Sequence, residues 1–430
     1  MPPSPIPRNR PRRTLTRGQR VLFRLLLLVG VWGVMELLSL GGLWLWHSGW
    51  SQASADMLRE SHLEQVEKRI GESDEVLHPF VGFVRRPTEQ TRPHQGKLGI
   101  SDFGYLDDSP PLRKRGDDRV LIGIVGGSVA EEFATAARGE FERQLRMSPE
   151  FQDKKLEFVR LAMGGYKQPQ QLLTVTYLLA LGAEFDILIN VDGYNEIVLP
   201  AVENRPAQTF PGFPRVWQAR IIETSEMAVL RKIGRVSYLR ERTRQRAGWF
   251  CRPPWRYSPT MTLLWASLNN LLQAQLNREV GEINALKQQD HDYAVTGPPL
   301  LLADDAAYHE YCAELWKDSS WQLHQLATAN GIRYFHFLQP NQYDIGSKPQ
   351  MGAEERIAVF KDGHPGKLHV EQGYPILRRK GEELSAAGVR FIDLTGMFVD
   401  HPERVYSDYC CHLTDHGNNL LAERIAQAIR

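Results

Sequence analysis

The sequence predicts an α/β protein in which a five-stranded parallel sheet lies between two layers of helices. From residue 119 onward, short apolar runs of strand length alternate with longer segments of helical periodicity. Glycine pairs end the first two runs, as expected for tight turns. Alternating strands and helices favour a parallel sheet covered on both faces. Ligands of such sheets bind at the carboxyl ends of the strands, so we look there for functional residues.

The elements follow one another in a regular order. The five expected strands cover residues 120–125, 156–163, 185–191, 332–339 and 390–394. The expected helices cover residues 133–145, 168–181, 306–330, 371–387 and 417–429.

Composition excludes some classes of function. A net charge of +1 over 430 residues gives no basis for a nucleic-acid partner. The four cysteines, Cys251, Cys312, Cys410 and Cys411, lack the spacing of zinc ligands, and we expect neither a metal nor a cofactor. In an oxidising compartment Cys410 or Cys411 could pair with Cys312 or Cys251, and the sequence leaves the pairing open.

The N-terminus predicts a membrane anchor. Residues 1–24 contain seven arginines and no acid, and the apolar stretch 25–46 would span roughly 33 Å as a helix. The positive-inside rule keeps residues 1–24 in the cytoplasm, which predicts a single-pass protein of the inner membrane with an extracytoplasmic main domain. A cleavable signal peptide ending at Ala53-Ser54-Ala55 is the alternative. Glu36 interrupts the stretch, and pairing with a helix of another protein would offset its cost.

Residues 47–118 are expected to form a stalk and a segment before the main domain, with a helical stalk over residues 51–75. The main domain covers residues 119–430 and includes a helical insertion at about 200–297. Within the insertion, residues 215–256 carry eleven basic residues against three acids, interleaved with aromatic residues. This segment is either a lid or docking surface for a polymer, or a solvated helical face.

Polar residues follow four of the predicted strands. They are Gly126-Gly127-Ser128, Gly164-Gly165-Tyr166, the run from Asp192 to Glu196, and the run from Asp408 to His412. Acyl-ester chemistry needs a nucleophilic hydroxyl, a base, a group that orients the base, and donors for the oxyanion. A serine in a glycine turn, a late histidine and an asparagine supply these groups.

These four blocks, in this order, resemble those of the SGNH/GDSL hydrolase superfamily over roughly residues 119–199 and 332–429. The resemblance implies a flavodoxin-like fold. It also implies that Ser128 is the nucleophile and His412 the base, and that the Ser128 amide, Gly165 and Asn195 form the oxyanion hole. Asp408 would orient His412.

The chain departs from the family pattern in one important respect. Tyr409 occupies the position three residues before the histidine, and Asp408 lies four before it. An extra residue in the loop could still let Asp408 reach the His412 ring. Alternatives remain: Ser128 as a helix cap, and His416 as a rival base that faces outward from the last helix. Asp192 is expected to be structural, and Gln339 and Asn341 either contact substrate or form a plain turn.

Three functions fit this pattern. The first is an esterase that removes an ester, such as O-acetyl, from an envelope polysaccharide or lipid. The second is a polysaccharide O-acetyltransferase that uses the same serine and histidine with a membrane acyltransferase partner. The third is a non-catalytic scaffold on this fold. The partners expected are therefore an acylated carbohydrate or lipid and the membrane.

Overall fold

The computed structural model describes residues 16–47, 75–89, 91–93, 98–221, 227–287 and 293–430. The chain divides into two compact units, one of residues 73–230 with 284–430 and one of residues 1–72 with 231–283. The expected stalk of residues 51–75 lies almost wholly outside the described residues, as do the first 15 residues of the basic tail.

The larger unit contains the predicted five-stranded parallel sheet. The strand order is β6-β5-β7-β8-β9, in which the first strand of the sheet along the chain lies between the second and the third. This is the flavodoxin-like doubly wound order, so the predicted fold class is confirmed. The strands are β5 (Arg119–Gly126), β6 (Lys155–Arg160), β7 (Ile187–Asp192), β8 (Arg333–Leu338) and β9 (Arg390–Asp393).

Apolar residues make the strands central to the core. Every residue of β7 is buried, and in β5 Ile122 pairs with Phe158 on one side and Ile187 on the other. A strand that is buried on both faces has no need of polar alternation, which explains the continuous apolar runs of the sequence.

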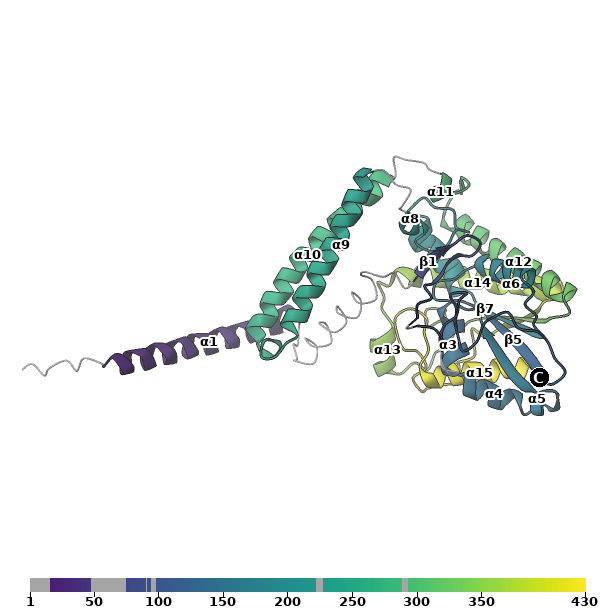
Figure 1. Cartoon of the computed structure of the whole chain (residues 1–430), viewed down its shortest axis with the longest axis horizontal. Helices are drawn as coiled ribbons and strands as arrows, with labels where there is room; N and C mark the ends of the chain where they lie inside the picture. The colour runs from purple at the N-terminus through teal and green to yellow at the C-terminus, as the bar shows by residue number, and fades with distance from the viewer. Residues whose placement is uncertain (1–15, 48–74, 90, 94–97, 222–226, 288–292) are drawn as a thin grey trace, which may run out of the picture. The chain divides into compact units, whose positions relative to one another are not determined.

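Helices cover both faces of the sheet (Figure 1). On one face α15 packs against α3 and α4, and on the other α12 packs against α6 and α14. Their bounds are α3 (Ser128–Ala136), α4 (Arg138–Leu145), α6 (Gln170–Ala180), α12 (Asp305–Ala329), α14 (Pro365–Ala386) and α15 (Asp415–Ile429). A four-residue helix, α5 (Pro149–Gln152), precedes β6, and α13 (Ala353–Val359) precedes α14.

Two predicted helices differ from the structure. The single helix expected over residues 133–145 is wrong, because α3 ends at Ala136 and a new helix begins at Arg138. The Thr135 hydroxyl donates to the carbonyls of Glu131 and Glu132, and such back-bonding destabilises and bends helices. The helix expected from residue 371 begins earlier, at Pro365, where a proline suits the first helical turn.

The segment before the sheet forms two small antiparallel pairs that the sequence did not reveal. One pairs β1 (Glu75–His78) with β2 (Gly82–Arg85), and the other pairs β3 (Gly99–Ile100) with β4 (Leu106–Asp107). Phe83 and Tyr105 belong to the same buried cluster as the sheet. This segment is thus part of the core of the larger unit.

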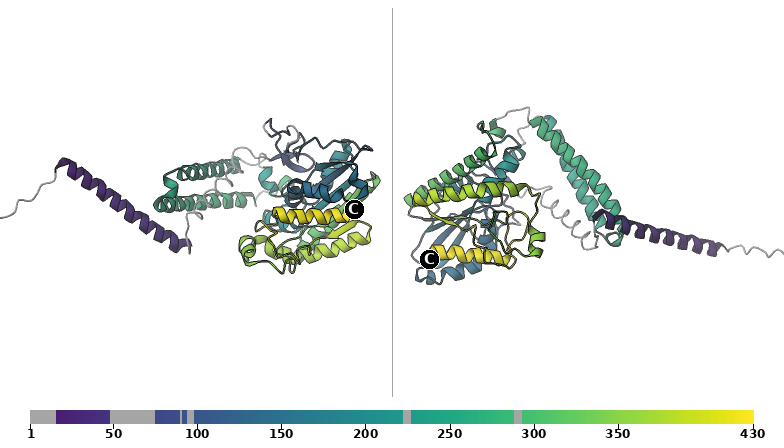
Figure 2. Two further views of the ribbon diagram at one scale, coloured as in Figure 1. Left: turned by 90° about the horizontal axis from the view of Figure 1, so that it is seen from below. Right: turned by 180° about the vertical axis from the view of Figure 1, so that it is seen from behind.

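The insertion between β7 and β8 is mostly helical, as predicted. It begins in the larger unit with α7 (Tyr194–Leu199), η1 (Pro200–Asn204) and α8 (Trp217–Arg220). It continues with α9 (Met227–Phe250), the 3₁₀ turn η3 (Trp255–Tyr257) and α10 (Pro259–Lys287), and ends with α11 (Tyr293–Thr296). Helices α9 and α10 lie side by side as a hairpin (Figure 2), with Phe250, Trp265 and Ala266 in its core.

The smaller unit also contains α1 (Arg17–His47), which is long and apolar enough to cross a membrane, as an anchor or as a signal sequence. The Glu36 carboxylate of α1 accepts hydrogen bonds from the Ser258 hydroxyl and, at 3.0 Å, from the Thr260 N–H. The Thr260 hydroxyl donates to Ser39 at 3.1 Å. Glu36 therefore has partners in the start of α10, within its own chain, where the sequence suggested a helix of another protein.

Candidate active site

A glycine turn places Ser128 at the carboxyl end of β5, as the first residue of α3. A Cβ on Gly126, whose φ is +141°, would lie 2.1 Å from the Val191 carbonyl oxygen. A Cβ on Gly127 would lie 2.3 Å from the Asn195 side-chain nitrogen. Gly126 therefore admits only glycine, whereas a side chain at Gly127, whose φ is −87°, would have to displace the Asn195 amide.

The structure brings Ser128, His412 and Asp408 together in one line of contacts. His412 Nε2 lies 2.8 Å from Ser128 Oγ, and His412 Nδ1 lies 2.5 Å from Asp408 Oδ2. A neutral imidazole with its proton on Nδ1 would donate to the carboxylate and accept from the serine hydroxyl. This is the arrangement that activates a serine nucleophile.

The loop around Asp408 explains how an aspartate four residues before the histidine reaches it. Asp408 Oδ1 accepts from the N–H groups of Cys410 at 2.9 Å, Cys411 at 3.2 Å and His412 at 3.3 Å. The carboxylate thus organises a tight turn with one oxygen and holds the imidazole with the other. The extra residue is absorbed by this turn.

Two buried amides hold the loop from outside. Asn341 Nδ2 donates to the Cys410 carbonyl at 3.1 Å, and Gln342 Nε2 donates to the Asp408 carbonyl at 2.9 Å. Asn341 also forms the turn that was one of its two predicted roles, because its Oδ1 accepts from the Tyr343 N–H at 2.9 Å and its carbonyl accepts from the Asp344 N–H at 3.2 Å. Gln342 was missed, and no sequence signal separates it from its polar neighbours.

Electrostatics favour a charged His412 beside a charged Asp408. Burial alone would lower the pKa of His412, but the hydrogen bond and negative charge of Asp408, with the charge of Glu132, raise this pKa to about 9. For Asp408, burial acts to raise the pKa, and the contact with His412 outweighs it and lowers the pKa. The carboxylate therefore stabilises the imidazolium that forms when the histidine takes a proton.

Two of the predicted oxyanion donors, the Ser128 N–H and the Asn195 side chain, lie at the same turn. As the first residue of α3, Ser128 has an N–H with no carbonyl partner inside the helix. The Gly164 N–H donates to Glu131 Oε2 at 2.9 Å, and the next residue, Gly165, has a φ of +81°. The Asn195 side chain, which donates to the Tyr166 carbonyl at 2.8 Å, lies against the glycine turn.

Four charged residues near the site, which form two ion pairs, were not singled out from the sequence. Arg85 of β2 pairs with Glu131 at 2.5 Å, which connects the segment before the sheet to the glycine turn after β6. Arg215 pairs with Glu203 at 2.7 Å, and its Cδ lies 2.1 Å from where a Cβ on Gly165 would be. Only the folded chain brings these residues together, since they come from distant segments.

The remaining candidates take structural or peripheral places. Asp192 is buried and accepts from Trp316 Nε1 at 2.7 Å, and His336 Nε2 lies 2.8 Å away, so it is structural as expected. His416 is exposed in the first turn of α15.

None of the four cysteines, all of which the structure describes, takes part in a disulfide, and the sulfur atoms of Cys410 and Cys411 lie 3.5 Å apart. The hydrogen bond from Cys411 is the main cause that lowers the pKa of Cys410, to about 7. These two thiols thus form part of the turn that Asp408 organises.

No protein-family model matches the chain, and no curated protein matches it. Among solved structures, the chain is similar to a "putative acylhydrolase" from Bacteroides fragilis, with a TM-score of 0.33 and 11% identity over 74% of this chain and 89% of the other. A likeness of this extent says nothing about the chemistry of the site.

Proposed function

We propose that the protein is a membrane-anchored serine esterase of the SGNH type, which acts on an ester, such as O-acetyl, of an envelope polysaccharide or lipid. The observation that supports this proposal is the continuous line from Ser128 Oγ through the His412 ring to Asp408, with contacts of 2.8 and 2.5 Å. The Asn195 side chain, a predicted oxyanion donor, lies against the glycine turn that precedes this serine.

The reaction proceeds through an acyl-serine. Ser128 Oγ attacks the ester carbonyl carbon while its proton moves to His412 Nε2. The carbonyl oxygen becomes an oxyanion facing the Ser128 and Gly165 N–H groups and the Asn195 amide. The bond to the alcohol breaks, and His412 returns the proton to the alcohol oxygen. Water then attacks the acyl group, His412 takes and returns a proton again, and the acid leaves.

The membrane part of the proposal is supported by α1. Its length and apolar surface suit a bilayer, and the arginines before it favour a cytoplasmic N-terminus. On this proposal the larger unit faces away from the cytoplasm, where envelope polysaccharides and lipids are its accessible esters. A cleaved signal sequence would give the same compartment without the anchor.

Replacement of Ser128 tests the activity. Ser128→Ala should abolish hydrolysis of p-nitrophenyl acetate and labelling by a fluorophosphonate, with the circular dichroism spectrum unchanged. Full esterase activity in Ser128→Ala would overturn the proposal. A wild-type protein that is folded but takes no label would instead favour the scaffold alternative, which the Asp408–His412 contact disfavours.

Deletion of the gene separates hydrolysis from transfer. An esterase predicts an envelope polymer that gains acetyl groups on deletion, and an acetyltransferase predicts one that loses them, as read by mass spectrometry of the purified polymer. Glu36, the residue that suggested a partner helix, already has hydrogen-bond partners in Ser258 and Thr260 of its own chain. This removes one of the observations that suggested transfer with a membrane partner.

A further inference from the structure

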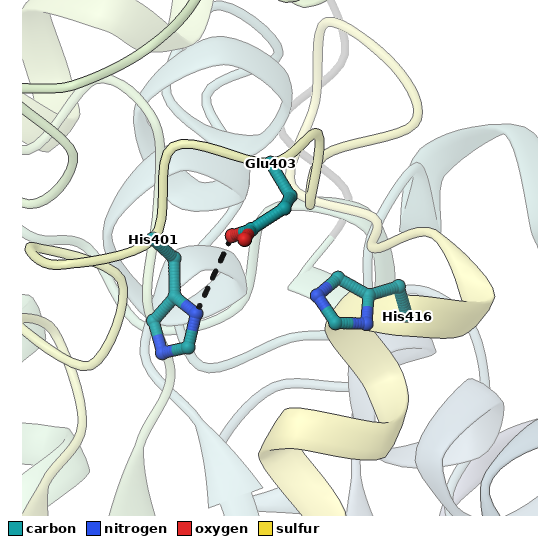
Figure 3. A group of neighbouring side chains, drawn as sticks. All are labelled: His401, Glu403 and His416. Carbon is teal, nitrogen blue, oxygen red and sulfur yellow. Dashed lines mark ion pairs between the residues drawn. The ribbon is translucent and has the colours of Figure 1, made fainter.

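Two histidines and a glutamate converge at the base of the loop that carries Asp408 and His412. His401 and Glu403 precede the loop, and His416 follows it in the first turn of α15 (Figure 3). One ligand atom from each of the three lies within 4.8 Å of the others, and His401 Nδ1 lies 3.8 Å from Glu403 Oε2.

The donor set and spacing suit a transition-metal ion. Two imidazoles and one carboxylate are the ligands of many zinc sites that keep a fourth position for water. With Zn–N and Zn–O bonds of about 2.0–2.2 Å, tetrahedral ligand atoms lie about 3.3 Å apart. The side chains must therefore move inward by at most about 1.5 Å. Their exposure permits this, since 28% of the His401 side chain and 60% of the Glu403 side chain are accessible.

The backbone that carries the three side chains is already held in place. The buried Lys348 ammonium donates to the carbonyls of His401 at 2.8 Å and Glu403 at 2.5 Å. On the other side of the loop, the Thr414 hydroxyl accepts from the Gly417 N–H at 3.1 Å and caps α15. A pre-positioned backbone lowers the entropy that ligands lose on binding a metal.

The same three residues bracket the loop. Its two arms join through the Thr414 N–H and the Val405 carbonyl, 2.8 Å apart, and through a bridge between Tyr406 and Leu413. A metal that takes His401 and Glu403 from one arm and His416 from the other would cross-link the base of the loop just outside these bonds.

We propose that His401, Glu403 and His416 bind one Zn²⁺, or a similar divalent transition metal, which fastens the base of the loop that carries Asp408 and His412. The binding site stands on its own geometry. Only its effect on catalysis rests on the proposed esterase function.

Titration of the full-length protein with Zn²⁺ tests the site. The protein, purified in detergent and stripped of metal with a chelator, is titrated with ZnCl₂ by calorimetry and by competition with a chromophoric chelator. We expect one ion per chain. His401→Ala, Glu403→Gln and His416→Ala should each weaken binding at least about tenfold, since each removes one of three ligands. His324→Gln and Glu354→Gln, which lie outside the cluster, are matched controls and should bind as the wild type does.

Two further measurements keep the test independent of activity and of the folding of variants. Co²⁺ in the wild-type protein should give the intense visible bands of a tetrahedral site, whereas Mg²⁺ should not compete. Hydrogen exchange of residues 405–414 should slow on addition of Zn²⁺ in the wild type but not in His416→Ala. Failure of the wild type to bind one Zn²⁺, or unchanged binding in a His401→Ala/His416→Ala protein, would overturn the proposal. Ser128→Ala, which should lose esterase activity, should still bind one Zn²⁺. Metal binding can therefore be tested separately from the proposed esterase function.

Discussion

Replacement of Asp408 by asparagine removes the charge beside His412 and leaves a side chain of the same size. In the wild type the pKa of His412 is raised from 6.5 to about 9. The shift corresponds to about 3 kcal/mol of preference for the imidazolium. If all of this preference acts in the transition state, its loss lowers about 300-fold the rate constant of the enzyme form in which His412 is neutral.

The loss should depend strongly on pH. A base with a pKa of about 9 is only about 1% neutral at pH 7, whereas one with an ordinary pKa near 6.5 is about three quarters neutral. Asp408→Asn should therefore cost about 300-fold on the plateau above pH 9 but only several-fold at pH 7. A change of imidazole tautomer would add to both losses.

The assay is the pH profile of kcat/KM for p-nitrophenyl acetate, with Ser128→Ala as the background at each pH. The wild-type rate should rise with pH to a midpoint near 9 because only neutral His412 can accept a proton. The midpoint for Asp408→Asn should fall toward 6.5. Asp415→Asn, an exposed aspartate in α15, is the control and should keep the wild-type midpoint. A midpoint unchanged in Asp408→Asn would refute the reasoning.

Further replacements test the other parts of the site. Asn195→Ala should lower kcat about 100- to 1000-fold with KM little changed, as measured by initial rates, if its amide stabilises the oxyanion. Asn341→Ala should lower kcat about tenfold and speed hydrogen exchange of the loop it holds, because a loosened loop misplaces the base; normal exchange would contradict this. Gly165→Ala should lower activity, and adding Arg215→Ala should restore it only in part, since the φ of +81° stays unfavourable for alanine. Asp192→Asn should lower the free energy of unfolding of the larger unit by about 3 kcal/mol in urea, and an unchanged midpoint would argue against a structural role.

The sequence predicted those parts of the molecule that depend on local pattern. The apolar runs located the strands, and because parallel strands end at one edge, Ser128 and His412 were expected to meet. The contact of 2.8 Å between their side chains agrees with that expectation. Gly126 was informative because its positive φ and the nearby Val191 carbonyl permit no side chain there.

Features that depend on packing between distant segments could not be predicted from the sequence. Strand β2 has only four residues, too few to show a pattern, and its Arg85 reaches Glu131 only in the folded chain. Arg215 approaches Gly165 because of the path of the insertion, which composition does not fix. The turn that lets Asp408 reach His412 depends on three backbone N–H groups, which have no signature in side-chain identity.

The contact between Glu36 and the start of α10 has a consequence for the order of biosynthesis. Glu36 and Ser258 are 222 residues apart, and ribosomes add about 5–20 residues per second. Helix α1 therefore exists for about 10–45 seconds before its hydrogen-bond partners are made. During that interval the Glu36 carboxyl group lacks the hydrogen bonds from Ser258 and Thr260. Assembly of the smaller unit is in this sense a late event that follows synthesis of α1 by more than two hundred residues.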